Sequence, residues 1–230
     1  MRVAILSDSL SAAARIYDGI RHVSGCEIFL VVRVQGNSWL LWQAARWLKY
    51  KHRRRSVQLL LRGQVKFLHH PFDHPASLRI LQQGSFDIGL HNAGVIYRES
   101  TIHCFRLGIL NAHIGILPEY RGRSVMEWSL IQGDRTGITV FFIDGGIDTG
   151  EKIVLWEQVD VWHTRSTAQA KQFLFAQDVL LFRKALERLQ SPAFQFETNN
   201  IGSGRRYYVM SNLFSEVIDN LLAERKEPLR

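Results

Sequence analysis

The sequence has few cysteines and no long apolar run. Cys26 and Cys104 are the only cysteines among 230 residues, too few for the disulfide framework of a small secreted domain. A membrane-spanning helix needs about 18–20 apolar residues in a row, whereas the best apolar run, residues 28–32, has the length of a strand. No secretory signal pattern follows Met1. These absences predict a cytoplasmic protein with reduced thiols and no membrane span.

Acidic residues are missing from one long stretch. No Asp or Glu occurs between residues 28 and 72, which hold nine of the 29 Lys and Arg residues. The rest of the chain has 20 basic and 21 acidic residues, so the net charge of +8 comes from this basic segment, residues 33–66. Such a field attracts anions: nucleic acid, phosphate esters or an acidic membrane surface. A helix over residues 38–51 would carry Trp39, Trp42 and Trp47, either as a basic amphipathic surface or, as we favour, as a core helix with a solvated polar side.

Elsewhere, short apolar runs alternate with helical periodicity. Hydrophobic residues make up 46% of the chain, enough for a buried core. Alternation of strands and helices predicts βαβ units, and hence an α/β fold with a mostly parallel, twisted sheet and helices on both faces. We expect a catalytic domain over residues 1–190 and a C-terminal extension with a terminal helix over residues 191–230. The predicted strands are residues 2–6, 26–34, 65–67, 86–90, 108–112, 137–143 and 152–161, and the predicted helices are residues 9–23, 76–83, 123–132, 166–189 and 213–225.

The loop after the first strand lacks the G-x-G-x-x-G pattern of dinucleotide-binding folds. It contains Ser7, Asp8, Ser9 and Ser11 instead, which argues against a nicotinamide or flavin dinucleotide. Ligands of such sheets bind at the carboxyl ends of the strands. Ser9 is therefore a candidate for substrate contact, or it caps the helix that follows.

Three polar residues in the middle of the chain form the main candidate site. Asn111 and His113 stand two residues apart near a strand end, so their side chains share a face. An amide and an imidazole placed in this way can both donate to one developing oxyanion. Asp148, in a glycine-flanked loop, can orient the imidazole or relay a proton. No Ser or Cys nucleophile accompanies them, which suits direct attack by an amine of the substrate. On spacing alone, the alternative stays open that Asn111 and His113 merely close the strand.

Further motifs surround these residues in a fixed order. Leu117-Pro118-x-Tyr120-Arg121-Gly122 follows His113, and Asp144-x-Gly-Ile-Asp148-Thr-Gly150 comes later, with Trp128, Gly133-Asp134 and Thr136-Gly137 between them. This series resembles the folate-dependent formyltransferase family, which includes phosphoribosylglycinamide, methionyl-tRNA and sugar-nucleotide N-formyltransferases and formyltetrahydrofolate hydrolases.

The resemblance implies a Rossmann-like formyltransferase fold that uses 10-formyltetrahydrofolate as co-substrate. By position in the motifs, Asn111 and His113 would stabilise the oxyanion on the formyl carbon, and Asp148 would assist the imidazole. The folate would lie between two loops, largely on backbone groups. These loops are Gly94, Val95, Ile96 and Tyr97, and Asp144, Gly145, Gly146 and Ile147. No metal is implied, and His69, His70 and His74 fit no standard metal spacing.

The basic segment and two arginines beside the site indicate an anionic acceptor. Arg121 and Arg123, with Ser9, would hold an aminosugar nucleotide or a phosphorylated amine such as glycinamide ribotide. Alternatively, the two arginines are solvated or pair with Glu119 or Glu127. The chain departs from the family at His113-Ile114-Gly115, where His-Pro-Ser is frequent, so the loop there is expected to differ.

Two other functions stay open. One is a formyltetrahydrofolate hydrolase, in which water is the nucleophile. The other is a non-catalytic protein on the same fold that binds nucleic acid or a membrane surface, although such a protein has no need of Asn111, His113 and Asp148 together. Nucleic acid is a partner that we do not favour. The sequence leaves the acceptor amine and the oligomeric state open, including a homo-oligomer.

Overall fold

The computed structural model describes residues 1–34 and 58–224, in two compact units, Met1–Asn111 and Ala112–Arg230. The helix predicted over residues 38–51, with its three tryptophans, lies outside the described residues. So do six of the nine basic residues of the basic segment. The domain boundary predicted at residue 190 stays a prediction.

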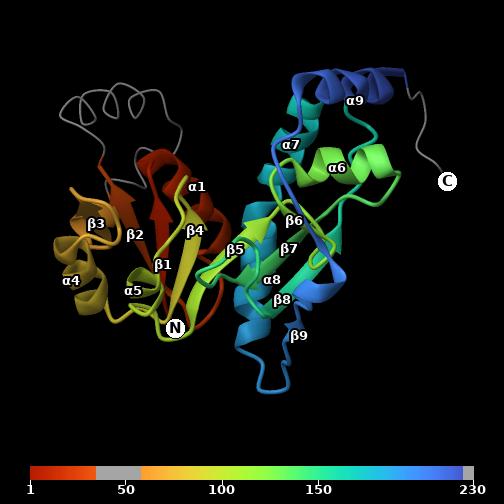
Figure 1. Ribbon diagram of the computed structural model, residues 1–230. Coiled ribbons are helices and arrows are strands. Elements are labelled where there is room, and N and C mark those ends of the chain that lie inside the picture. The colour runs from red at the N-terminus through yellow and green to blue at the C-terminus, as the bar shows by residue number, and fades with distance from the viewer. Residues whose placement is uncertain (35–57, 225–230) are drawn as a thin grey trace. The chain divides into compact units, whose positions relative to one another are not determined.

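The first unit is built on a parallel sheet in the order β3-β2-β1-β4-β5 (Figure 1). Its order reverses between β1 and β4, and in such sheets ligands bind at the carboxyl ends of the strands that flank this point. The crossovers β1-α1-β2 and β3-α4-β4 run in opposite directions, so right-handed connections place α1 and α4 on opposite faces. The elements are β1 Arg2–Ser7, α1 Leu10–Ile20, β2 Glu27–Arg33, β3 Val65–Leu68, α4 Pro75–Gly84, β4 Ile88–Asn92, α5 Glu99–Ile102 and β5 Gly108–His113, whose last two residues belong to the second unit.

Strand β1 and helix α1 show why the first unit folds in this way. Val3, Ile5 and Leu6 in β1 are fully buried, as expected for a parallel strand covered on both faces. Helix α1 begins after Ser9, whose side chain accepts from the Ala12 amide at 3.4 Å. The predicted helix cap at Ser9 is confirmed, and the polar residues of the loop lie at the carboxyl end of the central strand.

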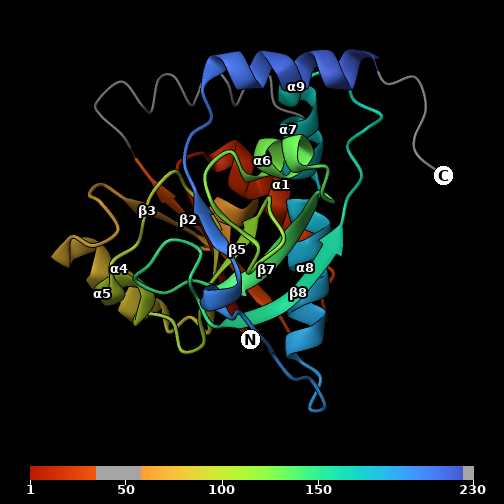
Figure 2. The same cartoon turned by 45° about the vertical axis from the view of Figure 1, so that its right-hand side comes forward.

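The second unit combines antiparallel strands with four helices among its described residues. Strands β7 and β8 pair antiparallel and β9 extends them, whereas β6 and β10 form a separate two-stranded parallel ribbon. Helix α9 packs across α6 and α7 (Figure 2). The elements are β6 Tyr120–Gly122, α6 Val125–Gln132, β7 Gly137–Phe142, β8 Lys152–Gln158, α7 Thr167–Ala176, α8 Asp178–Leu189, β9 Glu197–Thr198, the 3₁₀ turn η1 Ile201–Ser203, β10 Arg205–Tyr207 and α9 Asn212–Glu224.

The predicted α/β fold with a mostly parallel sheet is confirmed, but the single helix predicted over residues 166–189 is wrong. The structure has two helices there, α7 and α8, which are separated at Gln177. The Gln177 amide bonds to the Leu174 carbonyl, a tight turn that ends α7. Asp178 then occupies the first turn of α8, where a carboxylate favours a helix start. No helix in the described residues is long and apolar enough to cross a bilayer.

Asp87 ties the start of β1 to the segment before β5. Its carboxylate accepts from the Arg2 amide at 2.7 Å and from Arg106 Nε. Burial raises the pKa of Asp87, but these hydrogen bonds and the positive charge of Arg106 outweigh burial and lower it. The folded carboxyl therefore binds its proton less readily than the unfolded one does. Its contribution to stability is present above the ordinary pKa of 3.8 and is lost as pH falls through the lower folded pKa.

We expect Asp87→Asn to lower the free energy of unfolding by on the order of 1 kcal/mol at neutral pH, because an ionised acceptor is lost. Urea unfolding at a series of pH values measures this. The gap between variant and wild type should close as the solution is acidified below the ordinary carboxyl pKa. A gap that is independent of pH would show that the carboxylate charge is not the cause.

Candidate active site

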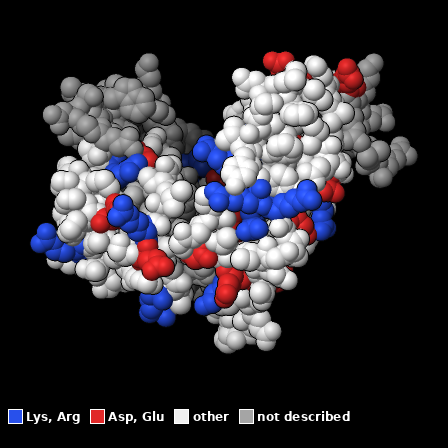
Figure 3. Space-filling model, in the orientation of Figure 1, with Lys and Arg blue, Asp and Glu red and all other residues white. Residues whose placement is uncertain are grey.

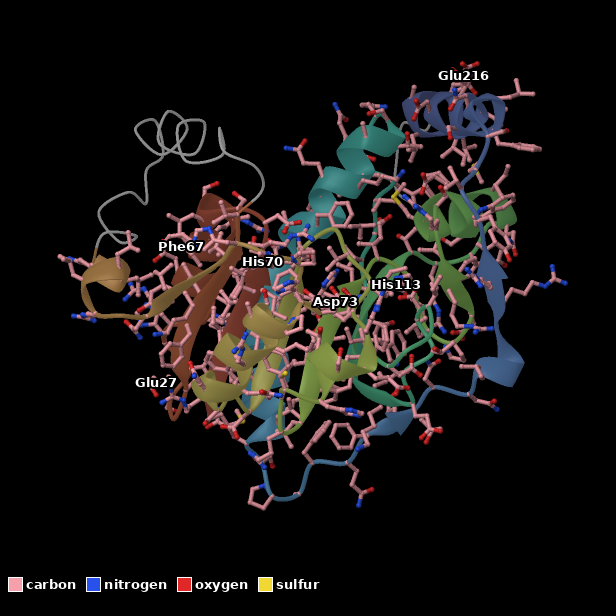
Figure 4. The ribbon with its side chains drawn as sticks, turned by 60° about the vertical axis from the view of Figure 1, so that its left-hand side comes forward. Glu27, Phe67, His70, Asp73, His113 and Glu216 are labelled. Carbon is pink, nitrogen blue, oxygen red and sulfur yellow. The ribbon has the colours of Figure 1, made fainter. Side chains whose placement is uncertain are left out.

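Each ring nitrogen of His113 faces an oxygen atom. It ends β5 and is 7% exposed, and it lies inside the second unit in Figure 4. Its Nε2 is 2.8 Å from the carbonyl oxygen of Tyr120, and its Nδ1 is 3.5 Å from Asp148 Oδ2. A carbonyl only accepts hydrogen bonds, so Nε2 carries a proton. Nδ1 is the ring nitrogen that faces the Asp148 carboxylate.

Asp148 occupies an unusual backbone conformation that directs its side chain to His113. Its φ is +54°, in the left-handed region that Asp tolerates better than most residues. Its Oδ2 accepts from the Gly122 amide at 2.9 Å, which fixes the carboxylate. The 3.5 Å separation from Nδ1 exceeds a normal hydrogen bond. Nδ1 therefore keeps its capacity for a hydrogen bond to another partner.

Asn111 precedes His113 by two positions on β5 and is the last residue of the first unit. It is half-buried, and its side-chain amide makes no hydrogen bond to the described residues. An amide at this level of burial usually has a partner. Asn111 therefore has a hydrogen-bonding capacity that a ligand can use.

The turn after His113 depends on Gly115 and Thr139. The Thr139 hydroxyl is fully buried, donates to the Gly115 carbonyl at 2.8 Å and accepts from the Leu117 amide at 3.0 Å. A Cβ added to Gly115 would lie 2.8 Å from His113 Nε2 and from the Tyr120 carbonyl. Only glycine fits between these groups, which explains why this chain has a glycine two residues after the histidine.

The segment after α8, which we predicted as an extension outside the catalytic domain, supports both sides of this site. Asn199 is 3% exposed, and its Nδ2 donates to the carbonyls of Asp148 at 3.2 Å and Gly150 at 3.1 Å. Strand β10 pairs with β6, which supplies the Tyr120 carbonyl to His113 and the Gly122 amide to Asp148. Sequence reasoning missed Asn199, because a single asparagine among polar residues carries no periodic signal.

We expect Asn199→Ala to lower kcat by about 10- to 100-fold, because small displacements of a reacting group have effects of this size. The matched control is Asn200→Ala, which removes the neighbouring amide, whose side chain only caps the exposed Gly202 amide. The variants are compared by kcat over a pH series. Equal losses in both variants would mean that Asn199 does not position Asp148.

The two loops proposed for the folate present mainly backbone. In the second unit, Asp144 Oδ1 accepts from the Gly146 amide at 2.9 Å and from the Thr149 hydroxyl at 2.7 Å. Gly145 and Ile147 in the same loop make no hydrogen bonds to the described residues. Their amides and carbonyls are open to a ligand.

In the first unit, Tyr97 is 4% exposed, packs on Phe72, and its hydroxyl lies 3.2 Å from His91 Nδ1. Burial raises the pKa of Tyr97, so the hydroxyl stays protonated. Gly94 donates its amide to Asp8 at 3.3 Å, and Ile96 is exposed. The buried Tyr97 side chain thus anchors this loop, whereas Ile96 and the backbone form its exposed surface.

The three candidate acceptor residues differ in their contacts and in their exposure. Ser9 caps α1, and its hydroxyl is 2.9 Å from that of Ser11. Arg121 donates to the carbonyls of Ile201 and Gly204. Arg123 is exposed and has no ion pair with any described residue. The alternative pairing with Glu127 is not found, because the partner of Glu127 is Lys171.

The charges of the first unit are already partly balanced. Arg33, the first member of the basic segment, forms a two-point ion pair with Asp8 at 2.8 and 3.0 Å.

The rings of His70 and His74 stack on each other, with their centres 4.0 Å apart, in the loop before α4. Within residues 1–34 and 58–224, no group of three or more His, Cys, Asp or Glu side chains is arranged to hold a metal ion.

Comparisons with known proteins agree with the predicted resemblance. Residues 94–186 match the formyl transferase family. Methionyl-tRNA formyltransferase from Syntrophus aciditrophicus (strain SB) is 39% identical over 89 residues, which are 38% of this chain and 28% of that protein. The match thus spans less than a third of that relative's length.

Solved formyltransferases share the fold. Phosphoribosylglycinamide formyltransferase from Bacillus halodurans superposes with a TM-score of 0.58 at 20% identity, over 84% of this chain and 97% of that chain. The formyltransferase PseJ from Anoxybacillus kamchatkensis, in complex with UDP-4,6-dideoxy-4-formamido-L-AltNAc and tetrahydrofolate, gives 0.54 at 17% identity over 90% and 85%. The predicted resemblance is confirmed: residues 94–186 match the formyl transferase family, and the chain has the fold of solved formyltransferases.

Proposed function

We propose that this chain is an N-formyltransferase that moves a formyl group from 10-formyltetrahydrofolate to the primary amine of an anionic small molecule. The observation that carries the proposal is the pair of buried His113 and half-buried Asp148, 3.5 Å apart, with the unpaired amide of Asn111 two residues before His113. This pair lies within the segment that matches the family.

The residues present fit a folate co-substrate. The unused backbone groups of Gly145 and Ile147 suit the alternating donors and acceptors of a pterin edge, and the Asp144 turn holds them in place. When bound, 10-formyltetrahydrofolate supplies the formyl group that the amine attacks. The carbon–nitrogen bond to the folate breaks, and the proton lost by the amine ends on the departing nitrogen.

The chain's own residues have separate tasks in this reaction. Asp148 orients the imidazole of His113, and an N–H at Nδ1 together with the Asn111 amide donates to the formyl oxygen, where negative charge develops. The Tyr120 carbonyl keeps the ring from turning. Asp148 is also the nearest described carboxylate to Nδ1 and accepts the proton that leaves the amine.

Release of tetrahydrofolate tests this proposal. The full chain is incubated with 10-formyltetrahydrofolate alone, and then with glycinamide ribotide, with a UDP-linked aminosugar and with methionyl-tRNA. We expect rapid release only with a small phosphate-bearing amine. Release without any amine, abolished in Asp148→Asn, would instead identify a hydrolase, which is the alternative open from the sequence. Absence of both release and folate binding would mean that the family's chemistry is missing from this chain.

A further inference from the structure

The β6–β10 ribbon has two chemically different faces. Arg206 is the register partner of Arg121, so their side chains lie on the same face of the ribbon. Arg123 and Tyr208 follow these strands directly, and the Arg123 amide donates to the Tyr207 carbonyl at 3.1 Å, so the two chain segments are still paired there. The guanidinium of Arg206 lies 5.3 Å from the centre of the Tyr208 ring, which confirms that these two share a side. We call Arg121, Arg123, Arg206 and Tyr208 the outer face.

The inner face of the β6–β10 ribbon packs on the rest of the second unit. The rings of Tyr120 and Tyr207 stack at 5.2 Å, and Trp128 of α6 lies 5.6 Å from Tyr207. The Tyr120 hydroxyl donates to Asp134. Burial and this hydrogen bond raise the pKa of Tyr120, so it stays neutral. The ribbon is therefore rigidly anchored, and its outer face is a fixed platform.

The outer face is charged, exposed and unneutralised. Arg123 and Arg206 are exposed, Tyr208 is 67% exposed, and neither arginine forms an ion pair with a described residue. Figure 3 shows a band of Lys and Arg atoms across the second unit, where Figure 1 places the ribbon. Arg123 and Arg206 belong to neighbouring strands and are diagonal to each other in the register, and two such guanidinium groups suit a ligand with more than one anionic group.

The platform also joins the candidate active site directly. Arg121 stands between Tyr120, whose carbonyl contacts His113, and Gly122, whose amide contacts Asp148. Arg121 itself is held by the carbonyls of Ile201 and Gly204 at 3.1 and 3.4 Å. Strand β6 thus carries part of the outer face and also supplies the backbone groups that contact His113 and Asp148.

We propose that this outer face binds the acceptor by its phosphates and by a flat ring, so that the acceptor is a nucleotide-linked amine rather than an amine with a single phosphate. Arg123 and Arg206 contact the phosphoryl groups, and the free side of Tyr208 stacks on the base. A single phosphate would leave one guanidinium and the aromatic ring unused. This inference rests on the proposed function for the identity of the ligand as acceptor, but the binding itself does not need the reaction.

Binding of nucleotides to the full chain tests the proposal without folate. UDP, dTDP, GDP, ADP and inorganic pyrophosphate are titrated calorimetrically into wild type, Arg206→Ala and Tyr208→Ala. The matched control is Arg205→Ala, which removes the same charge from the same strand, but on the inner side. We expect at least one nucleoside diphosphate to bind, with affinity about tenfold lower in Arg206→Ala and within about twofold of wild type in Arg205→Ala.

The outcomes separate the alternatives. Tyr208→Ala should weaken nucleotide binding and leave pyrophosphate binding unchanged, because only the base needs the ring. Equal losses in Arg205→Ala and Arg206→Ala would overturn the proposal in favour of a diffuse positive field, as would absence of binding by every nucleotide. A single-stranded RNA that binds far more tightly than any nucleotide, with the same dependence on Arg206, would reassign the face to RNA.

Failure of the proposed function gives a different pattern. If nucleotides bind in a way that depends on Arg206 but the chain transfers no formyl group, the outer face is a nucleotide-binding site but not an acceptor site. If the chain formylates a nucleotide-linked amine and Arg206→Ala leaves its KM unchanged, the proposed function stands, and the claim that the outer face binds the acceptor is wrong.

Discussion

Replacing Asp148 by asparagine is expected to lower kcat by about 10²- to 10⁴-fold, the range that a positioned acid or base contributes. The change removes the negative charge that faces His113 Nδ1 at 3.5 Å. Asparagine tolerates the left-handed backbone at this position, where φ is +54°. Its side-chain oxygen can still accept from the Gly122 amide, so the loop should keep its shape while the proton acceptor is lost.

The control for this variant is Asp160→Asn. Asp160 is an exposed loop carboxylate that accepts from the Trp162 amide two residues later. Its replacement by asparagine therefore removes the same charge by the same isosteric change. Its kcat should stay near that of wild type. Circular dichroism of Asp148→Asn must match wild type as well. A folded Asp148→Asn enzyme with wild-type kcat would remove Asp148 from the reaction.

Gly122→Ala is expected to destabilise the second unit by about 3 kcal/mol, from backbone strain together with separation of two strands. The φ of Gly122 is +102°, a conformation that side chains rarely adopt. An added Cβ would lie 2.2 Å from the Tyr207 carbonyl oxygen in β10. The substitution therefore forces β10 away from β6 and displaces the two contacts that hold His113 and Asp148.

The matched control is Gly133→Ala at the end of α6. Its φ is +75°, and nothing lies within 4 Å of an added Cβ. It should cost only about 1 kcal/mol, from strain in the left-handed region. Urea unfolding of both variants gives the comparison. Equal costs would mean that the close approach of β6 and β10 contributes nothing to stability.

The arrangement of strands and helices in the first unit was predictable because its strands are continuous apolar runs. Residues 2–6 and 26–34 lie in parallel strands buried on both faces, and such runs are recognisable without a structure. The helix break at Gln177 was not predictable, because the apolar positions on either side continue with helical spacing. The roles of Asn111, His113 and Asp148 stay predictions, for which the contacts of His113 and Asp148 now give a physical basis.

The part of the site contributed by the C-terminal segment was invisible to sequence patterns. Strands β9 and β10 are two and three residues long, too short for a period of two to be recognised. Strand β10 contributes through backbone pairing with β6, and Asn199, which follows β9, binds two backbone carbonyls. Contacts of this kind depend on the path of the chain in space, not on the side-chain types along it.

The fate of the formyl carbon tests the central claim most directly. 10-Formyltetrahydrofolate labelled with ¹³C in the formyl group is mixed with the full chain and a nucleotide-linked primary amine, and the product is followed by NMR. The account predicts that the label appears in a formamide on the amine, and that it appears about 10²- to 10⁴-fold more slowly with Asp148→Asn. Label recovered as free formate, or label that stays on the folate with every amine offered, would contradict it.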